Sequence, residues 1–130
     1  MALRNNVAAA SALADAVRST LGPRGLDKML VSDGDVLVTN DGVTVLQNAK
    51  VEHPTARMLI DQSTAQDSQA GDGTTTTVIL TAELLQNALE LTERGVHPSI
   101  IGRGFRMAWE ACESGLKEIA RPMSEEQHLQ

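Results

Sequence analysis

The chain has 130 residues, of which 42% are hydrophobic, and a formal net charge of −6. This length suits one domain of ordinary size. The excess of acidic over basic residues argues against nucleic acid, whose phosphates are bound chiefly through Lys and Arg. No run approaches the ~20 consecutive apolar residues of a membrane span, and the N-terminus lacks the apolar run of a secretion signal. We therefore expect a cytoplasmic protein with neither a nucleic-acid nor a membrane partner.

The first half of the chain predicts one helix followed by one β-hairpin. Phe105 and Trp109 are the only aromatic residues, so the core must be aliphatic, which is typical of packed helices. An apolar stripe predicts a helix capped by Asn5 or Asn6 and running to about Thr20. Two β-branched runs, 36–39 and 43–46, flank Asn40-Asp41-Gly42, and this pattern is typical of a hairpin.

The second half of the chain predicts three further helices. We expect them from Pro54 to near Ala70, from the threonine run at 74–77 to Arg94-Gly95, and from Pro98 to about Arg121. The fold class is therefore mainly α, in one domain that carries one β-hairpin. Cys112 is the only cysteine and falls on the apolar stripe of the last helix, so we expect a buried thiol there. Phe105 and Trp109 on this helix indicate core packing or a subunit contact.

The most informative motif is Gly71-Asp72-Gly73-Thr74-Thr75-Thr76-Thr77, between two predicted helices. Its glycines allow close approach of the backbone to a ligand, and its carboxylate can hold a divalent cation. The threonines fall at the first turn of a helix, where free N–H groups and the helix dipole favour an anion. The motif therefore predicts a nucleotide-phosphate site.

Each glycine-centred turn also has a plain structural interpretation, which spacing alone leaves open. Asn40-Asp41-Gly42 is also a common hairpin turn, Leu21-Gly22-Pro23 is also a helix stop, and Gly71-Asp72-Gly73 is also an aspartate-capped helix start. No Walker A motif is present. His53 and His97 each precede a proline at a helix entry, and we expect structural roles for both rather than metal binding.

Taken together, these motifs resemble the chaperonins, specifically the group II type of archaea and the eukaryotic cytosol. The resemblance extends over about residues 5–121 and rests on segments that occur in the family's order. These segments are Thr20–Leu30, Asn40–Leu46, Val51–Pro54, Gln66-Asp67, Gly71–Thr76 and Gly95–Pro98. The two His-Pro segments among them favour the group II branch.

The resemblance implies a ring-forming, ATP-dependent protein-folding machine. Residues 1–130 would correspond to the first half of the family's equatorial domain, which binds nucleotide and contacts other subunits, in a double ring in the full-length family. A family subunit is about four times as long. Its intermediate domain, with the usual water-activating aspartate, and its apical domain, which grips unfolded proteins, have no counterpart in the chain.

The resemblance also assigns roles to individual residues. Asp72 would ligate the Mg²⁺ of bound ATP or ADP, while Gly73, Thr74, Thr75 and Thr76 would hold phosphate oxygens. Leu21, Gly22 and Pro23 would line the base, ribose and α-phosphate. Asp41 would be the catalytic residue near the γ-phosphate, with Gly42 beside it, and its carboxylate would order the attacking water or a K⁺ ion.

Two functions from different classes follow. The first is the ATP-binding portion of a group II chaperonin subunit, whose hydrolysis by the 130-residue chain alone would be very slow or absent. The second is a non-catalytic oligomerisation or interaction module derived from the equatorial domain. Its motivation is that half of such a domain should expose apolar faces.

Overall fold

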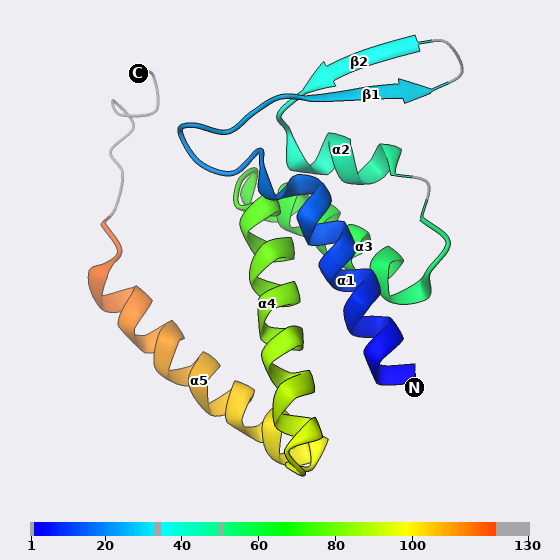
Figure 1. Ribbon diagram of the computed structural model, residues 1–130. Helices are drawn as coiled ribbons and strands as arrows, with labels where there is room; N and C mark the ends of the chain where they lie inside the picture. Colours follow the sequence, from blue (N-terminus) through cyan, green and yellow to red (C-terminus); the bar gives the residue numbers. More distant parts are fainter. Residues whose placement is uncertain (1, 33–34, 50, 122–130) are drawn as a thin grey trace. The chain divides into compact units, whose positions relative to one another are not determined.

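A computed structural model describes residues 2–32, 35–49 and 51–121 of the chain. Within these ranges it contains five helices and one two-stranded antiparallel sheet (Figure 1). In chain order the elements are α1 (Ala2–Arg18), β1 (Lys28–Ser32), β2 (Asp35–Thr39), α2 (Gly42–Asn48), α3 (Pro54–Ala70), α4 (Thr74–Glu93) and α5 (Pro98–Ile119). The predicted fold class, mainly α with one β-hairpin, is confirmed. The chain divides into two compact units, one ending at Glu90 and the other starting at Leu91.

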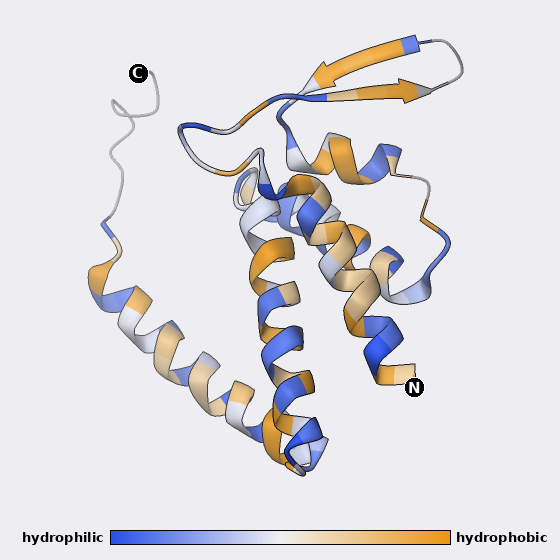
Figure 2. Ribbon diagram, in the orientation of Figure 1, coloured by the Kyte–Doolittle hydropathy of each residue, from blue (hydrophilic) through white to orange (hydrophobic). Residues whose placement is uncertain are grey.

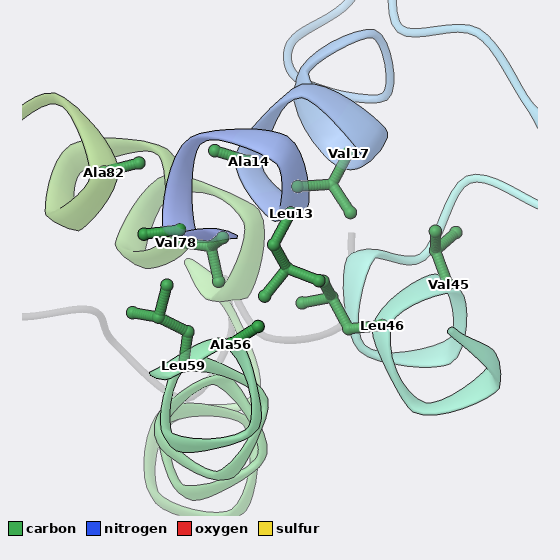
Figure 3. Close-up of a cluster of buried hydrophobic side chains, with 10 residues drawn as sticks. Leu13, Ala14, Val17, Val45, Leu46, Ala56, Leu59, Val78 and Ala82 are labelled. Carbon is green, nitrogen blue, oxygen red and sulfur yellow. The ribbon is translucent and has the colours of Figure 1, made fainter. Parts of the chain in front are cut away.

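The core of the first unit is aliphatic, as the composition predicted. Side chains from α1, α2, α3 and the first half of α4 point toward one another, among them Leu13, Leu46, Leu59 and Val78 (Figure 3). On α1 the buried residues recur every three or four positions, so one face of the helix packs and the other stays in solvent. This core brings the C-terminal end of α1 and the N-terminal end of α4 into one packed unit.

The β-hairpin lies earlier in the chain than the sequence predicted. The run 36–39 is a strand, but it pairs with the preceding segment, with Lys28 opposite Thr39 and Ser32 opposite Asp35. The predicted second strand, 43–46, is instead part of α2. The residues between Ser32 and Asp35 are Asp-Gly, a preferred pair for a two-residue hairpin turn.

The helix α2 forms because Asp41 caps it and because its apolar residues have helical spacing. One carboxylate oxygen of Asp41 accepts the Thr44 N–H at 3.0 Å and the Thr44 hydroxyl at 2.6 Å. Val43, Val45 and Leu46 are buried, whereas a strand would have pointed successive side chains to opposite faces. The interpretation of Asn40-Asp41-Gly42 as a hairpin turn is therefore wrong.

The other helix boundaries agree with the sequence except at the N-terminus. Helix α1 begins at Ala2, so Asn5 and Asn6 lie inside it and do not cap it. The ring nitrogen Nδ1 of His53 accepts the Thr55 N–H at the start of α3, and that of His97 accepts the Ser99 N–H at the start of α5. The expected structural role of both histidines is confirmed.

The second unit leaves the apolar stripe of α5 largely in solvent. Cys112 is exposed, so the predicted buried thiol is wrong. Trp109 is 61% exposed and Phe105 39%, which also contradicts core packing of this pair in the chain as described. Periodicity showed correctly that α5 is amphipathic, but it could not show whether the described chain supplies a partner for the apolar face.

Candidate nucleotide-binding site

A polar hollow of about 180 Å³ opens between the turn that follows α1 and the start of α4. Two segments fifty residues apart in the sequence line it: Thr20, Leu21 and Gly22 on one side, and Asp72, Gly73, Thr74, Thr75 and Thr76 on the other. The shared core of α1 and α4 holds these segments together. The sequence predicted all of these residues except Thr20 as parts of one site.

The α3–α4 junction presents a carboxylate and a tight backbone turn to this hollow. Asp72 is exposed, and its Oδ1 accepts the N–H of Gly73 at 2.6 Å. Gly73 has a φ of 78°, in the left-handed region that L side chains rarely adopt, so glycine is needed there. The backbone therefore turns sharply from Asp72 through Gly73 into α4, and the Asp72 carboxylate lies beside the Gly73 N–H group.

The first turn of α4 contains N–H groups that make no hydrogen bond within the helix. The N–H groups of Thr74, Thr75 and Thr76 have no carbonyl one turn earlier to accept them, whereas Thr77 N–H bonds the Gly73 carbonyl at 2.9 Å. The Thr77 hydroxyl also bonds that carbonyl. No hydrogen bond within the described ranges occupies the hydroxyls of the other three threonines. The dipole of a twenty-residue helix adds partial positive charge at this end, so the turn is suited to bind an anion.

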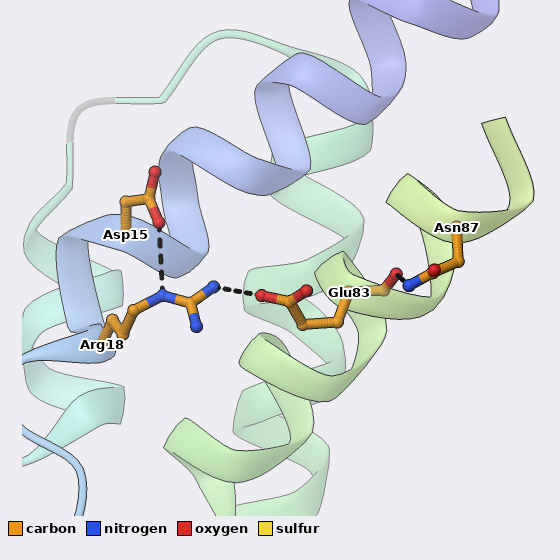
Figure 4. Close-up of polar contacts among 4 residues, drawn as sticks. All are labelled: Asp15, Arg18, Glu83 and Asn87. Atoms are coloured by element: carbon orange, nitrogen blue, oxygen red, sulfur yellow. Dashed lines mark hydrogen bonds and ion pairs between the residues drawn. The ribbon is translucent and has the colours of Figure 1, made fainter. Parts of the chain in front are cut away.

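The opposite wall is held by bonds at the end of α1. Leu26 N–H donates to the Ser19 carbonyl at 2.7 Å and Gly25 N–H to the Gly22 carbonyl at 2.9 Å, which closes a compact loop. One turn before the hollow, the Arg18 guanidinium binds Glu83 of α4 at 2.5 Å and Asp15 of its own helix at 3.4 Å (Figure 4). This exposed ion pair links the two helices whose ends form the hollow.

The start of α2 lies directly against the threonine run. A Cβ placed on Gly42 would overlap the Thr75 hydroxyl oxygen, and Gly42 itself is buried. The neighbouring Asp41 is exposed, and the hydrogen bonds from Thr44, chiefly that from its hydroxyl, hold the pKa of the Asp41 carboxyl below its usual range. Asp41 is therefore a carboxylate at neutral pH, with one oxygen occupied by the cap.

The structure thus gathers most, but not all, of the predicted site residues. Among the described residues, Pro23 and Asp41 are outside the set that lines the hollow, and Gly42 reaches it only through Thr75. Two further residues were missed. Thr20 lines the hollow next to a recognised motif, and Gln66 donates from its side chain to the Asp72 carbonyl at 2.9 Å.

The donor set at Asp72 fits a magnesium ion that arrives with phosphates better than a stand-alone metal site. Within the described ranges, no three or more His, Cys, Asp or Glu side chains gather where they could hold a metal ion. Mg²⁺ commonly takes one or two carboxylates and completes its shell with phosphate oxygens and water. Oδ1 of Asp72 accepts the Gly73 N–H, whereas Oδ2 accepts no hydrogen bond within the described ranges and is the less engaged oxygen.

Comparison with known proteins defines the class. The model of the TCP-1/cpn60 chaperonin family matches residues 13–130, and the chain belongs to this family. Its relatives include thermosome subunit alpha of Thermoplasma acidophilum, 51% identical over 98% of this chain and 24% of that protein. Thermosome subunit beta of Archaeoglobus fulgidus is 53% identical over 96% of this chain and 23% of that protein. The predicted resemblance to the archaeal chaperonins is confirmed.

A solved structure supports the same assignment. A group III chaperonin crystallised in the open state superposes with a TM-score of 0.87 and 38% identity, over 95% of this chain and 25% of that one. The chain therefore spans about a quarter of the length of the relatives that it matches. No helix in the described part of the chain is both long and apolar enough to cross a membrane.

Proposed function

We propose that residues 1–130 are the ATP-binding part of the equatorial domain of a cytoplasmic chaperonin subunit. The whole protein would assist folding of unfolded proteins in an ATP-dependent ring of subunits. One observation carries this proposal: the hollow brings the predicted residues Leu21 and Gly22 together with the predicted segment 72–76, in a chain that belongs to the chaperonin family. The intermediate and apical functions of such a protein would reside in sequence outside these residues.

In this proposal each wall of the hollow has a chemical role. The N–H and hydroxyl groups of Thr74, Thr75 and Thr76 hold phosphate oxygens, because they are unused donors at a helix N-terminus. Asp72 supplies an oxygen to Mg²⁺, which when bound neutralises charge on the phosphates. Leu21, Gly22 and the neighbouring Pro23 face the remainder of ATP or ADP.

Asp41 and Gly42 complete the proposed site from the side of α2. The exposed Asp41 carboxylate keeps one oxygen free of the cap to orient the attacking water or a K⁺ ion near the γ-phosphate. Gly42 contributes by its lack of a side chain, which lets the start of α2 approach Thr75.

A thermal-shift experiment tests the nucleotide site. Millimolar Mg·ATP should raise the Tm of the chain, because a ligand that binds only the folded state stabilises it. Asp72→Ala should remove most of this rise. The matched control is Asp67→Ala, which removes another exposed carboxylate five residues earlier, on α3 and away from the hollow.

The outcomes separate the proposal from its alternatives. An equal rise for Asp72→Ala and the wild type would contradict the metal role of Asp72. No rise for the wild type would contradict a working nucleotide site in these 130 residues. A loss of the rise in Asp67→Ala as well would show that the effect is not local to the hollow.

A second candidate function, subunit association, is favoured by the hairpin. In the observed register Met29 pairs with Val38 and Val31 with Val36, so these four side chains share one face, which we call the outer hairpin face. All four are between 56% and 70% exposed, and both strands appear as apolar ribbon in Figure 2. On the other face, Leu30 packs against the core. We propose that the outer hairpin face contacts other subunits of the ring.

Sedimentation velocity tests this surface. The double variant Val31→Thr/Val38→Thr keeps β-branched strand residues but makes the face polar, so it should self-associate less than the wild type. Met58→Gln, a similarly exposed apolar residue on α3, is the control and should associate as the wild type does. A wild-type chain that stays monomeric and binds little apolar dye would contradict the proposal.

A further inference from the structure

Asp72 stands between two glycines and outside both helices. Gly71 ends α3 with a φ of 68°, and Gly73 starts the turn into α4 with a φ of 78°. Because glycine readily adopts either sign of φ, the Asp72–Gly73 peptide plane can rotate at little steric cost. Its rotation would turn the Gly73 N–H away from the Asp72 carboxylate.

One side chain holds this peptide in place from the outside. Gln66, on α3, donates from Nε2 to the Asp72 carbonyl at 2.9 Å, and within the described ranges this is the only hydrogen bond that the carbonyl receives. The same amide lies 3.4 Å from the position of a Cβ on Gly73, so it is packed over the turn. Gln66 itself is half-buried, which restricts its freedom to leave.

The carbonyl and the N–H of this peptide are therefore held by different groups. The carbonyl is held by Gln66, and the N–H is held by Oδ1 of its own Asp72 at 2.6 Å. Fixing the carbonyl fixes the N–H on the opposite side, because the peptide is planar. In this orientation Oδ1 of Asp72 is engaged by the Gly73 N–H, and Oδ2 accepts no hydrogen bond within the described ranges.

We propose that Gln66 is a positioning residue for the phosphate and metal site, an inference that rests on the proposed nucleotide binding. It does not touch the ligand. Its amide selects the peptide orientation in which Asp72 presents Oδ2 and the first turn of α4 presents its N–H groups. Without this bond, the loop would have to be ordered by the ligand at the moment of binding, which weakens binding.

The primary test replaces the donor without changing the shape. Gln66→Met should weaken Mg·ATP binding by isothermal titration about threefold to tenfold, the range expected for one neutral hydrogen bond. The matched control is Gln62→Met, which replaces an exposed glutamine one turn earlier on α3 and should bind as the wild type does.

A second variant distinguishes positioning from simple packing. Gln66→Glu keeps the size of the side chain, but its ionised carboxylate cannot donate to the Asp72 carbonyl. The ratio of its Kd to the wild-type Kd should be larger at pH 8 than at pH 5, where protonation begins to restore a donor. A ratio independent of pH would contradict the donor role.

A readout without ligand separates this inference from the proposed function. The Gly73 amide, observed by NMR, should exchange with solvent faster in Gln66→Met than in Gln62→Met or the wild type. If the wild type fails to bind Mg·ATP, the proposed function is overturned, and this amide still decides whether Gln66 positions the loop. If Gln66→Met leaves the exchange of the Gly73 amide unchanged, the inference is overturned. It is also overturned if the wild type binds Mg·ATP and Gln66→Met binds it with the same affinity.

Discussion

Gly42 shows how one missing side chain helps to build the site. The start of α2 packs against Thr75 so closely that a methyl group would overlap the Thr75 hydroxyl oxygen. In the sequence this glycine looked like a turn residue, chosen for its backbone freedom. In the structure its small size is what matters, because it lets α2 lie on the threonine run.

Gly42→Ala should destabilise the chain by about 1–3 kcal/mol, the usual cost of overpacking a tight contact. Chemical denaturation measures the loss. Removing the overlapping oxygen should recover part of it, so Gly42→Ala/Thr75→Ala should be less destabilised than the sum of its single changes.

The control for this substitution is Gly115→Ala on α5, where an added Cβ meets nothing within 4 Å. There alanine should stabilise by up to about 1 kcal/mol through helix propensity alone. Equal effects at the two glycines would mean that the contact with Thr75 is not tight in solution.

At the scale of elements, the competition between a hairpin and a helix at residues 40–46 was decided by Asp41 and by burial. The β-branched residues there favour a strand by local propensity. The cap and three apolar side chains on one helical face outweigh this preference. A short helix that would be marginal in isolation is thus held by tertiary packing.

The stability lost when the Asp41 cap is removed should depend on pH. Asp41→Ala should cost about 1 kcal/mol at pH 7, the typical value for an N-cap. Because the hydrogen bonds from Thr44 lower the folded-state pKa below the unfolded value of ~3.9, the charged cap stabilises fully above that pH. Its contribution is lost as the pH falls through the folded-state pKa.

Urea denaturation of wild type and Asp41→Ala between pH 7 and pH 3 checks this sign. The difference in unfolding free energy should be constant down to about pH 5 and should shrink below about pH 4. A difference that grows as the solution is acidified would contradict the assignment of Asp41 as a charged cap.

At the scale of the whole molecule, the hollow combines residues from two segments that are distant in sequence but adjacent in one core. It provides the groups needed for phosphate binding, namely donors at a helix start and one carboxylate. Phosphoryl transfer also needs a positioned attacking water. In the family that function is expected from an aspartate of the intermediate domain, in sequence outside these residues.

The 130-residue chain should therefore bind Mg·ATP without hydrolysing it at a useful rate. Phosphate release should be about 10²- to 10⁴-fold slower than from a full-length thermosome, the usual contribution of general acid–base groups. A comparable turnover per site would show that Asp41 suffices to activate water. Asp41→Ala would then be expected to abolish that turnover.

Much of this protein could be predicted from the sequence because the signals are local. The helices α1, α3, α4 and α5 follow from apolar spacing and from breakers such as Gly71 and Pro98. The prediction of a phosphate site rests on glycine, carboxylate and hydroxyl chemistry within seven residues.

The sequence by itself thus determined the family and the helical class, and it supplied the prediction of a phosphate site at 71–77. Only the tertiary structure decided that 42–48 is a helix, that Cys112 is exposed, and that Gln66 holds the Asp72 carbonyl. The physical reason is the same in each case. Burial and side-chain contacts depend on which elements pack together, and neither periodicity nor composition contains that information.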